Sequence, residues 1–127
     1  MRAYIDSNIL IWQLRGERRA SHLLRRISEE GNEELWIGAI QRAEIVFFMR
    51  DEEAAATLAL LSRFKTQPVT QEVVDRAGAL YRKWKPTHGI DVNDALLAAT
   101  VMLTGGKLYT LNVKHYPMSD LVVVPGW

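Results

Sequence analysis

The sequence predicts an α/β fold, a three-layer α/β/α sandwich with a central, mostly parallel β-sheet of about five short strands. Short runs of β-branched and aromatic residues alternate with longer segments whose apolar residues have helical spacing. This alternation is typical of helices packed around a parallel sheet. The 127 residues contain no internal repeat, low-complexity tract or linker. A chain of this length is most simply one domain, residues 1–127.

Composition narrows the class of protein. Apolar residues make up 48% of the chain, which argues against wholesale disorder. With 16 basic and 15 acidic residues, the net charge of +1 neither indicates nor excludes a nucleic-acid partner. The absence of cysteine excludes thiol chemistry, disulfides and Cys-ligated zinc. We see no signal peptide and no run of the ~20 apolar residues that a membrane span needs, so we expect a cytoplasmic protein.

The first half of the chain is expected to alternate strand and helix twice. The expected elements are a strand over 1–5, a short helix over 9–14, an amphipathic helix over 20–30, a strand over 34–37 and a helix over 39–49. Asp6, Ser7 or Asn8 could cap the first helix, and Gly31 should end the second.

Helices dominate the second half. Asp51 should cap a helix that carries Leu58, Leu61 and Phe64. Residues 67–69 mark a break with room for a brief strand. The remaining expected elements are a helix from Thr70 to just before Pro86, a helix that starts near Asp91, a short strand ahead of Asn112 and a last strand over 121–124.

Glu44 is the most informative single residue. In the helix expected over 39–49, one apolar stripe consists of Ile40, Ala43, Phe47 and Phe48. Glu44 falls within that stripe by its spacing of four, and a buried carboxylate is costly unless it is paired or binds a metal. The alternatives are a solvent-facing glutamate or a pair with Arg42 or Arg50, whose spacing suits neither.

Each of the other acids also has a structural explanation. Asp6 could simply cap the first helix. Asp91 and Asp94 are arranged as a capping box, with Asp91 at the N-cap, and we assign Asp91 to that role. The helix dipole favours an ionised Asp94 in the first turn, so a structural and a functional role are both open for it.

Asp6, Glu44 and Asp94 are together more informative than each alone. The fold would bring all three to the carboxyl ends of the strands. Clustered carboxylates repel one another, and a divalent cation relieves that repulsion. Oxygen ligands favour Mg²⁺ or Mn²⁺ over zinc. Such a site can activate water and stabilise a phosphoryl centre.

Four segments, in this order, carry a family resemblance: Tyr4–Leu10, Ala43–Ile45, Asn93–Thr100 and Leu108–Tyr116. They resemble PIN-domain ribonucleases, most closely the VapC-like toxins of bacterial and archaeal toxin–antitoxin pairs. The resemblance implies a Mg²⁺-dependent endoribonuclease, with Mn²⁺ as a substitute, that leaves a 5′-phosphate and a 3′-hydroxyl. It also implies an antitoxin partner and a homodimer.

Residue by residue, the resemblance assigns metal-binding and catalytic roles to Asp6, Glu44 and Asp94. It gives Asn112 a fourth catalytic position, where many relatives carry aspartate. Asn112 can orient a water or bind through its carbonyl oxygen, but it adds no negative charge. This leaves both one and two metal ions open.

An RNA substrate would need polar and basic groups around the acids. The candidate substrate-binding residues are Ser7, Arg15, Lys114 and His115. We expect the four tryptophans to be core or interface residues and not platforms on which bases stack. Apolar residues such as Leu58, Leu60 and Leu61 exceed one stripe and could meet a second copy or an antitoxin helix.

The main alternative is a catalytically silent PIN-like module that binds RNA or protein. Two other classes fit less well. A haloacid-dehalogenase phosphatase needs an acid where Asn8 stands, and a phosphate-receiver domain needs paired acids where Ile5-Asp6-Ser7 offers one.

Overall fold

The computed structural model describes all residues, 1–127, and contains one five-stranded sheet with the strand order β3-β2-β1-β4-β5. Every neighbouring pair of strands is parallel. The strands are β1 (Arg2–Ile5), β2 (Glu34–Gly38), β3 (Lys65–Gln67), β4 (Lys107–Thr110) and β5 (Val123–Pro125). The α-helices are α1 (Ser7–Leu14), α2 (Arg18–Arg25), α3 (Ala39–Val46), α4 (Ala54–Leu61), α5 (Gln71–His88) and α6 (Val92–Thr104).

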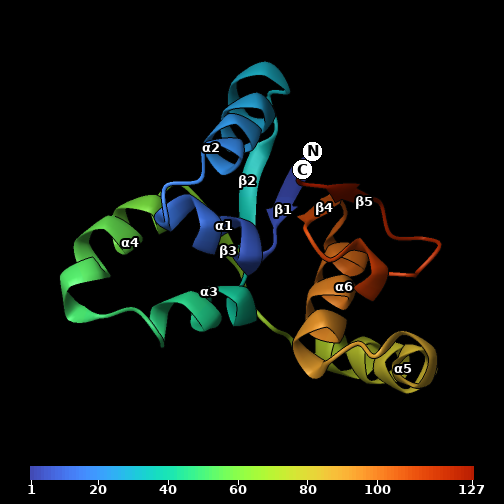
Figure 1. Ribbon diagram of the computed structural model, residues 1–127. Coiled ribbons are helices and arrows are strands. Elements are labelled where there is room, and N and C mark those ends of the chain that lie inside the picture. The colour runs from blue at the N-terminus through green and yellow to red at the C-terminus, as the bar shows by residue number, and fades with distance from the viewer.

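Helices cover both faces of the sheet, so the predicted three-layer sandwich is confirmed (Figure 1). Side chains alternate along β1 between the two faces. Ala3 and Ile5 pack in a core with residues of α1, α2 and α4. Tyr4 faces the other side and packs in a second core with residues of α5 and α6. No helix of the fold is long and apolar enough to cross a membrane.

The central pair of strands sets the position of the first acid. Ile5 of β1 is in register with Tyr109 of β4, and the Asp6 N–H donates to the Tyr109 carbonyl oxygen over 3.0 Å. Because all strands are parallel, their carboxyl ends meet at one edge of the sheet. Asp6 and Thr110 therefore lie next to each other where β1 and β4 end.

Gly106, just before β4, allows this register. Its φ is 122°, a conformation that suits glycine, and a Cβ at this position would lie 2.5 Å from the backbone oxygen of Arg2. The turn between α6 and β4 thus passes directly against β1.

The helix predicted over 39–49 is too long, because α3 ends at Val46. Arg50 is the N-cap of a 3₁₀ turn, Asp51–Glu53, that leads into α4, and its N–H donates to the Glu53 carboxylate. Asp51 is therefore not the cap of the helix that follows. Phe47 and Phe48 are 79% and 81% exposed. The predicted apolar stripe is therefore not the core-facing side of α3, which consists of Gln41 and Ile45.

The prediction that the helix after Thr70 ends before Pro86 is also wrong. Pro86 lies inside α5, which continues to His88. A proline in the last turn removes a single N–H donor. Gly89, in a left-handed conformation with φ 61°, then ends the helix by donating to the Lys85 carbonyl oxygen.

Other boundaries differ by a few residues. The second helix begins at Arg18 and closes in a π-helical turn, Arg26–Glu30. The last strand is Val123–Pro125 instead of 121–124. Leu60 and Leu61 are buried, which removes most of the apolar excess expected on α4, although Leu58 stays 44% exposed.

Candidate active site

Asp6 is a buried carboxylate at the centre of the edge, 7% exposed. It caps α1 through Oδ1, which accepts the Ser7 N–H over 2.8 Å. Its other oxygen, Oδ2, accepts from the Thr110 hydroxyl over 2.8 Å and from the Tyr116 hydroxyl over 3.3 Å. Three partners from three segments of the chain, Ser7, Thr110 and Tyr116, thus fix the position of this acid, and none of them carries a positive charge.

Asp94 reaches the same place from the first turn of α6. Asp91 and Asp94 form the predicted capping box: the Asp94 N–H donates to Asp91 over 2.7 Å, and the Asp91 N–H donates to Asp94 Oδ2 over 3.0 Å. The Tyr116 hydroxyl lies 3.2 Å from Asp94 Oδ1. This hydroxyl joins Asp6 to Asp94 but has one proton to share between them.

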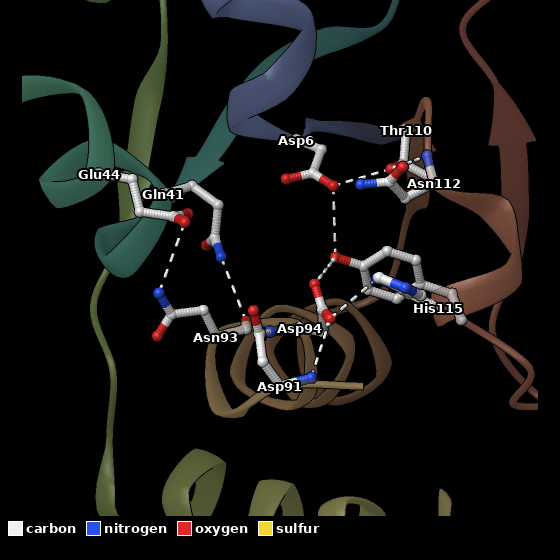
Figure 2. Close-up of polar contacts among 10 residues, drawn as sticks. Asp6, Gln41, Glu44, Asp91, Asn93, Asp94, Thr110, Asn112 and His115 are labelled. Carbon is white, nitrogen blue, oxygen red and sulfur yellow. Dashed lines mark hydrogen bonds and ion pairs between the residues drawn. The ribbon is translucent and has the colours of Figure 1, made fainter. Parts of the chain in front are cut away.

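Glu44 approaches from α3 and is half-buried. Its carboxylate accepts from the Ser7 hydroxyl over 3.2 Å and from the Asn93 amide over 3.4 Å. It makes no ion pair with Arg42 or Arg50, which were the alternatives at the sequence level. In Figure 2 the carboxylates of Asp6, Glu44 and Asp94 point toward a shared space between α1, α3 and α6.

Burial dominates the electrostatics of the three site acids, Asp6, Glu44 and Asp94. It raises the pKa of each carboxyl above its ordinary value, and hydrogen bonds only partly oppose it. The charge of Asp91 raises all three further. Burial, and then the charges of Asp6 and Asp94, also raise the pKa of Tyr116, which stays a neutral hydroxyl.

The remaining predicted site residues lie around this core. His115 Nδ1 is 3.2 Å from Asp94 Oδ2. Asn112 and Lys114 are exposed after β4, and the Asn112 N–H donates to the Thr110 hydroxyl over 3.0 Å. Arg15 ends α1 and borders a groove that also contains Glu44. Ser7 is 7% exposed, and its hydroxyl donates to the Glu44 carboxylate.

The oxygen atoms of Asp6 and Asp94 are ligands that suit a hard divalent cation. No three histidine, aspartate or glutamate side chains lie close enough together to hold one ion. Asp6 and Asp94 are the pair joined by one hydroxyl, and Mg²⁺ typically binds one or two carboxylates and keeps several waters. Glu44 lies across the shared space and would act through a water.

Sequence reasoning missed Tyr116 and Thr110, the two hydroxyls that hold Asp6. Both lie in Leu108–Tyr116, a segment that carries the family resemblance, in which only Asn112, Lys114 and His115 are assigned roles from sequence. It also missed Gln41, which is 2% exposed and donates to the Asn93 carbonyl oxygen over 3.3 Å. The available signal in the sequence was the spacing of four that puts Gln41 on the same side of the helix as Ile45.

Residues 3–118 match the model of the PIN-domain family. The chain belongs to the PIN-domain family. It is also 35% identical over 122 residues to ribonuclease VapC10 of Mycobacterium tuberculosis, a match that covers 95% of this chain and 90% of the relative. Ribonuclease VapC19 of the same organism is 36% identical over 115 residues, 90% of this chain and 91% of the relative. The predicted family is therefore confirmed.

Solved structures share the fold. A toxin–antitoxin complex from Klebsiella pneumoniae has a chain that is 26% identical to this one with a TM-score of 0.79, covering 98% of both chains. VapBC2 from Rickettsia felis, bound to a DNA fragment from its promoter, superposes with a TM-score of 0.80 at 21% identity, covering 100% of this chain and 99% of that one. The second likeness supports the PIN-like architecture alone.

Proposed function

We propose that this protein is a metal-dependent endoribonuclease that hydrolyses RNA phosphodiester bonds and acts as the toxin of a toxin–antitoxin pair. One observation carries the proposal. Asp6, which directly follows β1, and Asp94 of α6 lie on either side of one hydroxyl at the carboxyl edge of a PIN-domain sheet. The names of the relatives, ribonucleases VapC10 and VapC19, support RNA as the substrate.

Asp6 and Asp94 would hold Mg²⁺ or Mn²⁺, with Glu44 contributing through a water. When bound, the ion supplies charge neutralisation at the phosphate and lowers the pKa of a water molecule. The Ser7 hydroxyl and the Asn93 amide orient the Glu44 carboxylate. Because the pKa of Glu44 is raised, this carboxylate suits proton transfer with the attacking water.

The exposed polar residues around the acids would position the RNA. Arg15 and Lys114 neutralise flanking phosphates. His115 Nδ1 lies 3.2 Å from Asp94 Oδ2, where the ring would help to orient that carboxylate. Asn112 offers a neutral amide at the end of β4 that hydrogen-bonds to a phosphate oxygen or a water without adding charge.

The decisive experiment is RNA cleavage by purified protein in Mg²⁺, in Mn²⁺ and in EDTA. We expect metal-dependent cleavage by the wild type, products with a 5′-phosphate and a 3′-hydroxyl, and none by Asp94→Asn. Asp75→Asn removes an exposed acid from α5 and should cleave like the wild type. RNA binding without cleavage by the wild type would favour the catalytically silent module instead.

An antitoxin would dock next to the acids, in a groove of about 340 Å³ between α1, α3 and α4. Its wall includes Leu14, Phe48 and Met49, and Glu44 lies within it. An amphipathic helix in this groove would cover the site. Leu14→Glu should keep RNA cleavage but escape inhibition by the product of a small upstream open reading frame, whereas Ala79→Glu, at an exposed position of α5, should stay inhibited.

A homodimer would bury a second apolar hollow of about 270 Å³ between α5 and α6. Val74 and Val92 border it and are 50% and 56% exposed. Light scattering should give a dimer for the wild type and a monomer for Val74→Asp. A monomeric wild type at micromolar concentration would count against the dimer.

A further inference from the structure

Two tryptophans are exposed, and an arginine lies beside each. Trp12 of α1 is 43% exposed and Trp127, after β5, is 37% exposed. The guanidinium of Arg15 lies 5.3 Å from the centre of the Trp12 ring, and that of Arg19 lies 5.3 Å from the centre of the Trp127 ring. Neither indole is a core residue, so of the core and interface positions expected from sequence only a surface position is left for these two.

Trp127 is connected to the candidate active site by short contacts. The N–H of its neighbour Gly126 donates to the Thr110 carbonyl oxygen over 3.0 Å. The Thr110 hydroxyl in turn donates to Asp6 and accepts from the Asn112 N–H. The chain end therefore lies at the same edge of the sheet as the site acids.

Trp12 lies on the neighbouring part of this surface. Gly126 passes so close to α1 that a Cβ there would lie 3.1 Å from Ile9, which is one helical turn before Trp12 on the same side of the helix. The Trp12 carbonyl oxygen accepts from the Glu17 N–H, and the Glu17 carboxylate holds Arg19 over 2.7 Å. Both indoles thus border the junction of α1 and α2.

We propose that Trp12, Trp127, Arg15 and Arg19, the Trp–Arg strip, bind unpaired nucleotides that flank the phosphodiester held by the site acids. This inference rests on the proposed function in taking RNA as the ligand. Exposed indoles offer faces on which bases stack, and arginine adds cation–π and phosphate contacts. A duplex already stacks its bases internally, so the strip selects single strands.

Charge supports a nucleic-acid occupant. Arg15, Arg18 and Arg19 gather at this junction, and Glu17, between them in sequence, is already paired with Arg19. An exposed ion pair of this kind contributes little stability, so a phosphate can replace the carboxylate at Arg19 at low cost.

The test is equilibrium binding of a labelled, short, mixed-sequence single-stranded RNA and of the matching duplex, by fluorescence anisotropy in Mg²⁺. Asp94→Asn serves as the background, so that the RNA stays intact. Trp12→Leu and Trp127→Leu should each weaken binding of the single strand by about tenfold. Trp12→Phe and Trp127→Phe should retain most of the affinity, and duplex binding should change little.

Three results would overturn the proposal: unchanged single-strand affinity in the Leu variants, an equal loss in the Phe variants, or an equal loss for the duplex. The outcome is separable from that of the proposed function. A wild type that binds single strands through the strip without cleaving them refutes the nuclease and keeps the strip. Cleavage with an unchanged KM in both Leu variants keeps the nuclease and refutes the strip.

Discussion

Replacing Asp6 by asparagine should stabilise the metal-free protein and abolish its response to Mg²⁺. Asp6 is 7% exposed and has no cationic partner. Asparagine is as good an N-cap as aspartate, so the start of α1 should survive. Its amide also fits between the Thr110 and Tyr116 hydroxyls, each of which can donate or accept. The substitution therefore removes one charge from the site with little change in packing.

The size of the effect follows from Tyr116. Its hydroxyl oxygen lies 3.3 Å from Asp6 Oδ2 and 3.2 Å from Asp94 Oδ1, so these two carboxylate oxygens are at most about 6.5 Å apart, the sum of the two distances. Two unit charges at that separation repel by about 2.5 kcal/mol at an effective dielectric constant of ~20. Hydrogen bonds to a neutral amide are weaker than those to a carboxylate, by about 1 kcal/mol. We expect a net gain of about 1–2 kcal/mol in the free energy of unfolding.

Urea unfolding followed by circular dichroism, in EDTA and then in Mg²⁺, measures both parts of the prediction. Mg²⁺ should stabilise the wild type, since a ligand that binds only the folded state raises the free energy of unfolding. It should leave Asp6→Asn unchanged. The control, Asp75→Asn on the exposed face of α5, should match the wild type in both buffers. An Asp6→Asn protein that is less stable than the wild type in EDTA, or that Mg²⁺ still stabilises, would refute the reasoning.

Three further predictions concern pH, Tyr116 and Gly106. Burial raises the pKa of Asp6 in the folded state above the ordinary value of 3.8, so this acid destabilises the metal-free fold at neutral pH and ceases to do so as pH falls through its folded pKa. The stability advantage of Asp6→Asn should therefore shrink on acidification, and an advantage that is constant with pH would contradict this. Tyr116→Phe should weaken Mn²⁺ binding about tenfold in calorimetry, because the hydroxyl that aligns the two carboxylates is lost; an unchanged Kd would show that the hydroxyl does not position them. Gly106→Ala should lower the free energy of unfolding, measured in urea, by about 2 kcal/mol or more, because its Cβ would lie 2.5 Å from the Arg2 backbone oxygen. A stability within error of the wild type would contradict this close approach.

The sequence was sufficient for the order of elements because local signals mark each one. Asp91 and Asp94 form the predicted capping box, and Gly31 follows the second helix. The boundaries that failed depend on contacts outside the local pattern. Pro86 is tolerated because Gly89 closes the same turn, and α3 is cut short by a cap that the next turn forms at Arg50.

The site was only partly predictable, for a related reason. Asp6, Glu44 and Asp94 do face one space, but the argument that singled out Glu44 was partly wrong. Phe48, assumed to lie on a buried stripe, is exposed. The half-burial of Glu44 instead comes from its contacts with Ser7 and Asn93, which adjoin the other two acids in sequence. Tyr116 could not be found from periodicity, because it follows a single 3₁₀ turn, Val113–His115, where spacing carries no information on direction.

The same contacts explain why the proposed site would need a cation and not simply another hydrogen bond. The Asp6 and Asp94 carboxylates each accept from a backbone N–H at the start of a helix, α1 and α6, so neither carboxylate can move away without loosening that helix start. Between them stands Tyr116, whose burial and acidic neighbours keep it protonated, and whose one proton serves only one of the two acids at a time. The fold therefore holds two negative charges close together and compensates them incompletely. A divalent cation would supply the missing charge without requiring either helix to shift.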